Sequence, residues 1–316
     1  MIQVYLLLLA GLLLLFVSGK YLVESSVDFA RRLKIPTMLI GLTVVAFGTS
    51  APELLVSLQA AITGFPEMAM GNVVGSNISN ILLVLAITAL VYPVPVPAKS
   101  VRQDWPILML ASLVLFGFAW DGELTRLESL GMVLLLGAYL LFVVLSSRRQ
   151  ASILELKESE EEALEPSMKL WATLVIFVLS CGGLAFGADL LVENAAKIAE
   201  GFGISQRVIS ISMVAIGTSI PELATSVIAA LKKETDISVG NIIGSNIMNI
   251  LSVLGITGLI GGINVDASIA RVDIPVMLGV TFLLLLLMLP AARSKITRWE
   301  GLLMITIYLV YIYLIF

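Results

Sequence analysis

Long apolar stretches recur along the chain, and short polar stretches separate them. A helix needs about 20 apolar residues to cross the hydrocarbon core of a membrane. The pattern therefore predicts an all-α membrane protein with ten transmembrane helices, near residues 3–26, 37–63, 69–92, 104–120, 127–146, 169–194, 205–231, 238–261, 272–290 and 298–315.

The same pattern of residues occurs twice, at an offset of 169 positions. Residues 48–53 read Gly-Thr-Ser-Ala-Pro-Glu, and residues 217–222 read Gly-Thr-Ser-Ile-Pro-Glu. Across 41–90 and 210–259, 25 of 50 positions are identical. Each copy holds five predicted helices, an odd number, so the second copy enters the membrane from the opposite side. We expect two inverted five-helix repeats, 1–146 and 169–316, joined by a linker at 147–168.

Composition supports an integral membrane protein. The chain is 59% hydrophobic and only 13% charged, against about 25% charged residues in a soluble domain. It has no histidine and a single cysteine, Cys181. These counts exclude imidazole chemistry, an intramolecular disulfide and a cysteine-cluster metal site.

The basic residues predict the orientation in the membrane. Loops on one predicted face hold 15 of the 19 Lys and Arg residues, and the other face holds four. Basic loops stay in the cytoplasm, so we expect a multi-pass protein of the plasma (cytoplasmic or inner) membrane. Both termini would be extracytoplasmic and the linker 147–168 cytoplasmic. The linker holds six glutamates, which favour a solvated connection over a cation-collecting patch.

Two carboxylates stand out. Glu53 and Glu222 are the only charged residues in four apolar segments, 37–63, 68–98, 208–231 and 237–265. An ionisable group at the membrane centre costs about 2.5–3.5 kcal/mol, so it is normally retained for a function and faces a cavity or a partner. The repeat should bring both to one site. The alternative is a pair of buried carboxylates that merely stay protonated.

Each of these glutamates follows a proline, Pro52 or Pro221. Proline lacks a backbone donor and clashes with the preceding helical turn, and a carbonyl freed in lipid must find another partner. A cation can be that partner; the alternative is a simple kink. The expected ligands here are the carbonyls near Ala46, Thr49, Ala215 and Thr218 and the hydroxyls of Ser50 and Ser219.

A second repeated block, Gly-Asn-x-x-Gly-Ser-Asn-Ile-x-Asn, covers 71–80 and 240–249. Its small residues suit close helix packing in membranes. Serine and the last asparagine are four residues apart, hence on one helix face. We expect Ser76 and Asn80, and likewise Ser245 and Asn249, to present oxygens to the carboxylates. Interhelical hydrogen bonding is the alternative for the asparagines. The other asparagines, Asn72, Asn77, Asn241 and Asn246, are expected to serve packing.

The predicted ligands are all oxygen atoms. Such a set suits hard cations, and Ca²⁺ takes six to eight oxygens in flexible geometry. Soft metals are disfavoured. The residues therefore predict a transporter of cations, Ca²⁺ or Na⁺. They leave carrier and channel open, although an inverted repeat with carboxylates at the membrane centre favours alternating access.

The doubled Gly-Thr-Ser-x-Pro-Glu and Gly-Ser-Asn-Ile-x-Asn blocks resemble the two α-repeats of the cation/calcium exchanger superfamily, and specifically prokaryotic sodium/calcium exchangers. The resemblance covers essentially the whole chain. It implies a ten-helix inverted-repeat fold and Na⁺-driven Ca²⁺ antiport. It also implies that the first and sixth helices slide as a pair against the other eight.

The resemblance implies roles for individual residues. Glu53 and Glu222 would bind both Ca²⁺ and Na⁺, and Thr49 and Thr218 would help to bind Ca²⁺ through their carbonyls. The implied flanking Na⁺ sites are Ala46, Ser50 and Ser245 and, on the mirrored side, Ala215, Ser219 and Ser76. Similar exchangers often have Asp at the position of Asn249. Asn at both 80 and 249 leaves ion stoichiometry and K⁺ dependence open.

Other functions fit less well. Two buried carboxylates could instead carry protons in Ca²⁺/H⁺ exchange. An intramembrane serine hydrolase would need a base that this chain lacks. A passive channel would dissipate gradients rather than couple them. We expect no enzyme activity, no cofactor beyond the transported ions, no nucleic-acid partner and a monomeric transport unit within the lipid bilayer.

Overall fold

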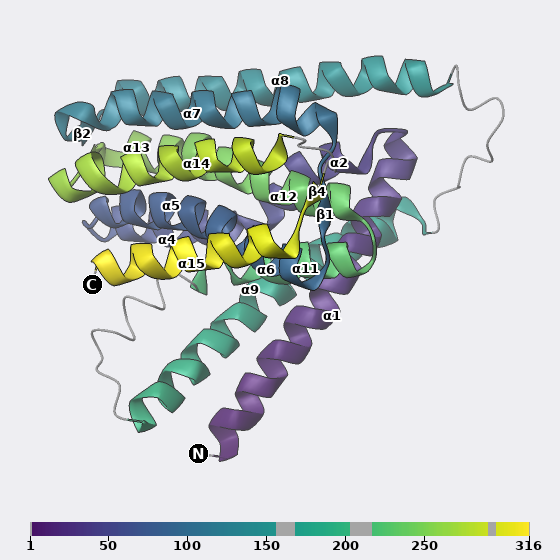
Figure 1. The fold of residues 1–316 in the computed structure, drawn as a ribbon, viewed down its shortest axis with the longest axis horizontal. Coiled ribbons are helices and arrows are strands. Elements are labelled where there is room, and N and C mark those ends of the chain that lie inside the picture. The colour runs from purple at the N-terminus through teal and green to yellow at the C-terminus, as the bar shows by residue number, and fades with distance from the viewer. Residues whose placement is uncertain (1, 156–167, 203–216, 290–294, 316) are drawn as a thin grey trace.

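The computed structural model describes residues 2–155, 168–202, 217–289 and 295–315, and most of them lie in helices (Figure 1). The α-helices are α1 (Ile2–Leu33), α2 (Thr37–Ile40), α3 (Ala46–Thr49), α4 (Ala51–Ile62), α5 (Glu67–Ser79), α6 (Ala86–Val91), α7 (Trp105–Phe118), α8 (Arg126–Glu155), α9 (Leu170–Gly201), α11 (Ile220–Leu231), α12 (Thr235–Met248), α13 (Gly255–Gly261), α14 (Ile274–Met288) and α15 (Arg298–Ile315). Five π-helical segments continue or precede them: η1 (Gly41–Val45), η2 (Asn80–Leu85), η3 (Ser100–Asp104), η5 (Asn249–Leu254) and η6 (Ile269–Asp273). A 3₁₀ turn, η4 (Ala119–Asp121), follows α7.

Seven helices in the described part of the chain are long and apolar enough to cross a membrane. The pair Thr37–Thr49 and Ala51–Ile62, which is bent by 41°, makes an eighth if its two parts cross as one span. The predicted all-helical membrane class is therefore confirmed, while the count of ten stays a prediction. The part of the predicted span 205–231 that precedes Gly217 lies outside the described residues. The helix predicted at 127–146 runs on to Glu155, into the expected linker.

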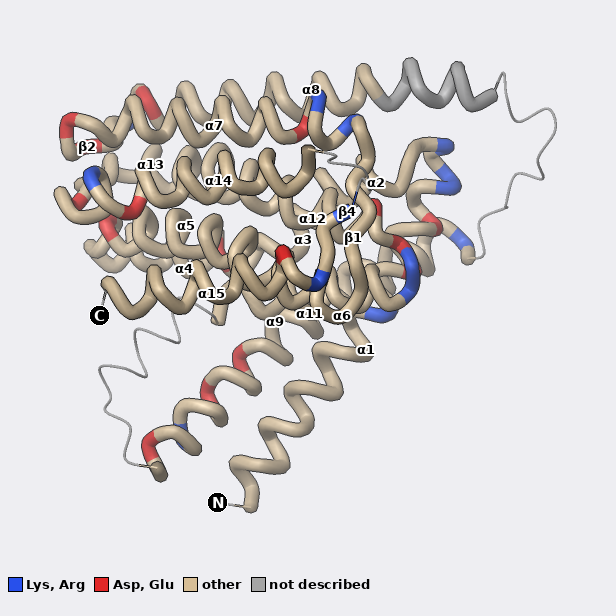
Figure 2. Tube along the Cα trace, in the orientation of Figure 1, with Lys and Arg blue, Asp and Glu red and all other residues tan. Residues whose placement is uncertain are grey.

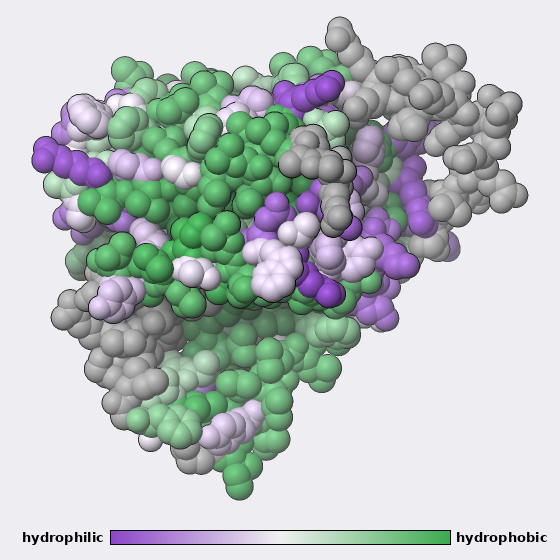
Figure 3. Space-filling model, viewed as in Figure 1, coloured by the Kyte–Doolittle hydropathy of each residue, from purple (hydrophilic) through white to green (hydrophobic). Residues whose placement is uncertain are grey.

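The two helices that carry the Gly-Asn-x-x-Gly-Ser-Asn blocks form the centre of the molecule. In the most apolar windows of Glu67–Val91 and Thr235–Gly261, 78% and 89% of residues are buried, against 22% in α1, α8 and α9. The outer helices present Leu, Val and Phe side chains, and the surface is largely apolar (Figure 3). Water would penalise such a surface, whereas lipid accepts it.

Glycines let the two halves of the sequence interlock at this centre. A methyl group on Gly240 or Gly244 of α12 would lie 2.6 and 2.5 Å from the carbonyl oxygens of Met38 and Leu42. Contacts that short require a residue without a side chain, as small-residue packing in membranes does. The halves therefore share one core and do not form separate bodies.

Short strands, which the apolar pattern did not predict, also join the halves. β1 (Val94–Pro95) pairs with β4 (Lys295–Ile296), and β2 (Glu123–Leu124) pairs with β3 (Ile263–Asn264). The helices that follow β2 and β4 start in the same way. Thr125 and Glu128 form a reciprocal cap at the start of α8, and Thr297 and Glu300 do so for α15.

Helices α1 and α9 lie side by side and project at an angle from the rest of the bundle (Figure 1). They approach closely at Gly11 and Gly187: a methyl group on Gly11 would lie 2.9 Å from the backbone nitrogen of Leu191. At the other end of the pair, Asp28 of α1 accepts hydrogen bonds from the Thr173 hydroxyl of α9 (2.6 Å) and from Arg32 (3.0 Å). The first and sixth expected helices thus form the pair that the sequence resemblance implies.

Candidate functional site

The site is built where two helices break at a proline. α3 ends at Thr49, α4 begins at Ala51, and Ser50 between them has φ −85° and ψ 3°. Ser219 before α11 has nearly the same conformation, φ −86° and ψ 0°. The two copies of the motif therefore have the same backbone. Each places its glutamate in the first turn of a helix, where the helix dipole favours negative charge.

Glu53 and Glu222 are both fully buried, with 0% of each residue exposed. The hydroxyl of Ser50, which belongs to the first repeat, donates to Oε1 of Glu222 in the second at 3.2 Å. The predicted convergence of the two motifs is thus present in the structure. Among the described residues no group of three or more His, Cys, Asp and Glu side chains could hold a metal ion, so any cation here must rely on neutral oxygens too.

Several buried oxygens at this place make no hydrogen bond. They are both carboxylate oxygens of Glu53, Oε2 of Glu222, and the amide oxygens of Asn80 and Asn249. A buried polar atom without a partner costs about 1–3 kcal/mol. A hard cation is a partner that such oxygens accept, and the donor set fits Ca²⁺ or Na⁺. The nitrogen of Asn249 is also unpaired.

The expectation of freed carbonyls needs a correction at Ala46. Its carbonyl accepts hydrogen bonds from the backbone nitrogen of Ser50 at 2.9 Å and from the hydroxyl of Thr49 at 3.3 Å, so it is not a freed carbonyl. Pro52 removes the donor that would bond four residues back, at Gly48. Ala215 lies outside the described residues.

The two threonines occupy matching positions. The hydroxyl of Thr49 lies 3.0 Å from Oδ1 of Asn241 and 3.3 Å from the hydroxyl of Ser245. Likewise, the hydroxyl of Thr218 lies 3.4 Å from Oδ1 of Asn72 and 3.1 Å from that of Ser76. Each side chain is thus held by the opposite repeat.

The other asparagines make the packing contacts that the sequence predicts. Asn77 and Asn246 each donate to the backbone carbonyl of the other, at 3.2 and 3.3 Å. Asn72 donates to Ser57, and its repeat counterpart Asn241 donates to Ser226. These bonds tie the central helices together.

Ser79 is a site residue that the sequence reasoning missed. Its hydroxyl is 2.6 Å from that of Ser219 and is fully buried. The repeat counterpart of Ser79 is Met248, which cannot make such a bond. The available signal was this difference between the two copies of the block. A comparison of the repeats looks for identical residues and therefore does not single out Ser79.

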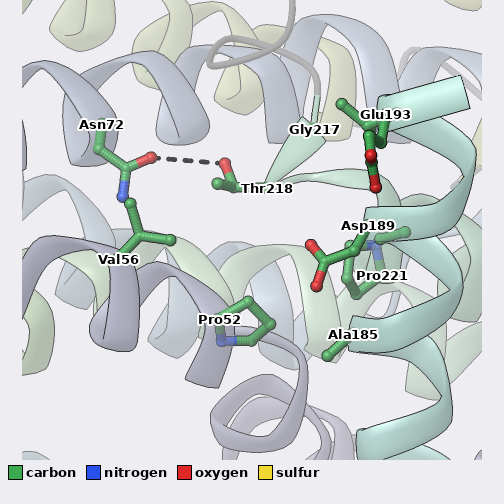
Figure 4. Close-up of a pocket in the computed structure, with 11 residues that line it drawn as sticks. Pro52, Val56, Asn72, Ala185, Asp189, Glu193, Gly217, Thr218 and Pro221 are labelled. Atoms are coloured by element: carbon green, nitrogen blue, oxygen red, sulfur yellow. Dashed lines mark hydrogen bonds between the residues drawn. The ribbon is translucent and has the colours of Figure 1, made fainter. Parts of the chain in front are cut away.

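A cavity of about 500 Å³ lies beside the carboxylates (Figure 4). Its lining includes Pro52 and Pro221, each adjacent to a site glutamate, and Thr218. The opposite wall comes from α9, whose Asp189 and Glu193 face the same space. The cavity is therefore lined by the residues that directly precede the two buried carboxylates.

Comparison with known proteins agrees with this geometry. The profile of the family described as sodium/calcium exchanger protein matches residues 3–145 and 172–316. The chain belongs to the sodium/calcium exchanger family. This family consists of transporters, and cation/Ca²⁺ antiport is the activity that membership supports.

Relatives of this exchanger chain match it over nearly their full length. CaxA of Alkalimonas amylolytica is 41% identical, over 98% of this chain and 97% of CaxA. The sodium/calcium exchanger MaX1 of Methanosarcina acetivorans is 32% identical, over 99% and 98%. A solved structure of the sodium-calcium exchanger NCX_Mj, soaked with Na⁺ and Sr²⁺, superposes with a TM-score of 0.81 at 31% identity, over 98% of each chain. The membrane fold is thus that of a sodium/calcium exchanger.

Proposed function

We propose that this protein exchanges Na⁺ for Ca²⁺ across the membrane. The observation that carries the proposal is the group of buried, unpaired oxygens around Glu53 and Glu222. Removing five polar atoms from water without partners is unfavourable unless an ion binds them. Family membership supports antiport as the activity, and NCX_Mj and MaX1 are named sodium/calcium exchangers.

In the proposed mechanism the two carboxylates bind Ca²⁺ and Na⁺ in turn. Ca²⁺ would take the carboxylates together with the Thr49 and Thr218 carbonyls. The remaining oxygens would hold Na⁺ in flanking sites and belong to Ala46, Ser50, Ser76, Asn80, Ala215, Ser219, Ser245 and Asn249. Two carboxylates bring a charge of −2, so one Ca²⁺ neutralises the site.

Access would alternate between the two faces of the membrane. Ten helices in two inverted repeats would give the two faces equivalent routes to the site. The α1 and α9 pair, which contacts the rest through α2, α3 and α11, would slide to open one route and close the other. Lys and Arg gather at the end of the bundle near α2 (Figure 2), which supports a cytoplasmic position for that end and extracytoplasmic termini.

Proton coupling is the second candidate. Oxygens of Glu53 and Glu222 that have no hydrogen-bond donor are equally suited to hold protons. With Na⁺ coupling, internal Na⁺ drives Ca²⁺ uptake at constant pH. With H⁺ coupling, internal acid drives it.

Uptake of ⁴⁵Ca²⁺ into proteoliposomes loaded in turn with Na⁺, K⁺ or acid tests the proposal. Uptake that requires internal Na⁺ at constant pH supports it, and uptake driven by internal acid alone refutes Na⁺ coupling. The family resemblance implies three Na⁺ per Ca²⁺, which moves one net charge. An interior-positive K⁺ diffusion potential should then accelerate uptake, because one charge in about 100 mV is worth roughly 2.3 kcal/mol. Uptake that ignores the potential indicates an electroneutral cycle.

A further inference from the structure

Helix α9 carries a carboxylate within its membrane-spanning stretch that the exchange site does not use. Asp189 lies in the apolar span Leu170–Gly201, and its side chain is exposed. A carboxylate at membrane depth is costly, so it normally faces water or a partner. The described residues give Asp189 no ion pair within 4 Å, whereas Glu193 one turn further pairs with Lys197 at 2.6 Å.

Asp189 faces the cavity beside the site. Figure 4 shows its carboxylate extending from α9 into the space between Pro52 and Pro221. Because those prolines directly precede Glu53 and Glu222, Asp189 and the neighbours of both site glutamates line the same cavity. A charge on the wall of a cavity with low-dielectric surroundings raises the local concentration of counter-ions.

The carboxylate of Asp189 has no acidic counterpart in the other repeat. At the offset of 169 residues, the counterpart of Asp189 is Lys20 on α1. The two positions thus carry opposite charges, although the flanking pairs Val23-Glu24 and Val192-Glu193 are identical. The ammonium of Lys20 lies 5.5 Å from the ring centre of Tyr21. An inverted route on the other face would therefore present a cation where this one presents a carboxylate.

We propose that Asp189 is a positioning residue at the entrance of the cation route, and that it makes exchange kinetically asymmetric. It concentrates cations at the face where the N-terminus of α1 and the end of α9 lie (Figure 1). The proposal rests on the proposed ion exchange. It adds that the apparent affinity for Ca²⁺ is higher from this face because of one side chain that never ligates the bound ion.

The test measures the KM for ⁴⁵Ca²⁺ in right-side-out and inverted membrane vesicles, for wild type and Asp189→Asn. At low ionic strength Asp189→Asn should raise the KM about fourfold at the Asp189 face, because one charge acts on a divalent ion across about 10 Å of water. The KM at the other face and the maximal rate should stay unchanged. Added choline chloride should abolish the difference, since salt screens exposed charges.

Two further variants keep the test informative. Asp189→Glu retains the charge and should behave as wild type. Asp266→Asn removes a carboxylate from an exposed loop, where hydrogen bonds from Ser268 lower the pKa of Asp266, and it should leave both KM values unchanged. If wild type exchanges ions but the KM of Asp189→Asn at the Asp189 face equals that of wild type at low ionic strength, the inference is wrong. If wild type shows no Na⁺-dependent Ca²⁺ exchange, the proposed function itself fails.

Discussion

Replacing Glu53 with glutamine tests the role of the carboxylate pair most directly. The side chain is fully buried and neither of its oxygens has a partner. Glutamine has nearly the same shape and carries no charge, so the ion-free protein should be at least as stable as wild type. The ion-bound form should lose stability. With both glutamates Ca²⁺ leaves no net charge at the site (−2 + 2 = 0), whereas with one it leaves a buried charge of +1.

The size of the loss follows from that uncompensated charge. Removing one partner of a buried ion pair costs about 3–5 kcal/mol, which is roughly two to four decades in the dissociation constant of Ca²⁺. A ligand at 100 times its dissociation constant stabilises the folded state by about 2.7 kcal/mol. For a chain of 316 residues this corresponds to a rise in Tm of about 4 °C. Glu53→Gln should lose that rise at the same Ca²⁺ concentration, and with it ⁴⁵Ca²⁺ exchange.

The assay is thermal unfolding of purified protein with and without Ca²⁺, followed by exchange in proteoliposomes. Glu67→Gln is a matched control, because Glu67 lies in the first turn of α5 and is exposed. It should keep both the Ca²⁺-induced rise and the exchange. A full Ca²⁺-induced rise in Glu53→Gln, or near-normal exchange, would show that this carboxylate does not bind the ion. Glu222→Gln should behave as Glu53→Gln does.

Three further changes test neighbouring parts of the site and the moving helices. Asn80→Asp or Asn249→Asp should alter the Na⁺ or K⁺ dependence of ⁴⁵Ca²⁺ exchange without loss of folded protein, and unchanged ion and pH dependence in both variants would make these asparagines packing residues. Ser79→Ala removes the partner of Ser219, worth about 1 kcal/mol, and should shift the Na⁺ concentration for half-maximal exchange about fivefold; Ser112→Ala, buried and bonded within its own helix, should not. Gly11→Ala places a methyl group 2.9 Å from the Leu191 nitrogen and should slow exchange without changing the Ca²⁺-induced rise in Tm, whereas Gly182→Ala meets no atom within 4 Å and should exchange at the normal rate.

The apolar pattern predicted the helices well because lipid leaves the chain few choices. A spanning segment must satisfy its backbone internally, so length and composition locate it. They do not locate its ends. The apolar stretch stops before the helix does, and α1 continues to Leu33 through turns that hold Arg31 and Arg32. They also do not predict β1 to β4, since two-residue strands depend on a partner that the other half supplies.

The repeated motif predicted that Glu53 and Glu222 converge, but not the contact of each threonine with a serine of the opposite repeat. Where the reasoning failed, it relied on symmetry or on local helix geometry alone. Ser79 was missed because Met248 breaks the repeat there. The carbonyl of Ala46 stays bonded because the residue four positions on is Ser50, which has an N–H, whereas Pro52 frees only the carbonyl at Gly48. Asp189 was passed over because its helix contains other charges.

The departures from symmetry affect how the ions bind. The backbones at Ser50 and Ser219 agree within a few degrees, yet Ser50 donates to Glu222 while Ser219 bonds to Ser79. Each hydrogen bond that an ion must break or share changes its binding free energy by about 1 kcal/mol, or about fivefold in affinity. In the proposed exchange, the two flanking oxygen sets should therefore bind Na⁺ with different affinities. Na⁺ ions should fill them in a fixed order. The set that contains Ser50 should be coupled to Glu222, because Ser50 bonds to this carboxylate and Ca²⁺ must also bind it.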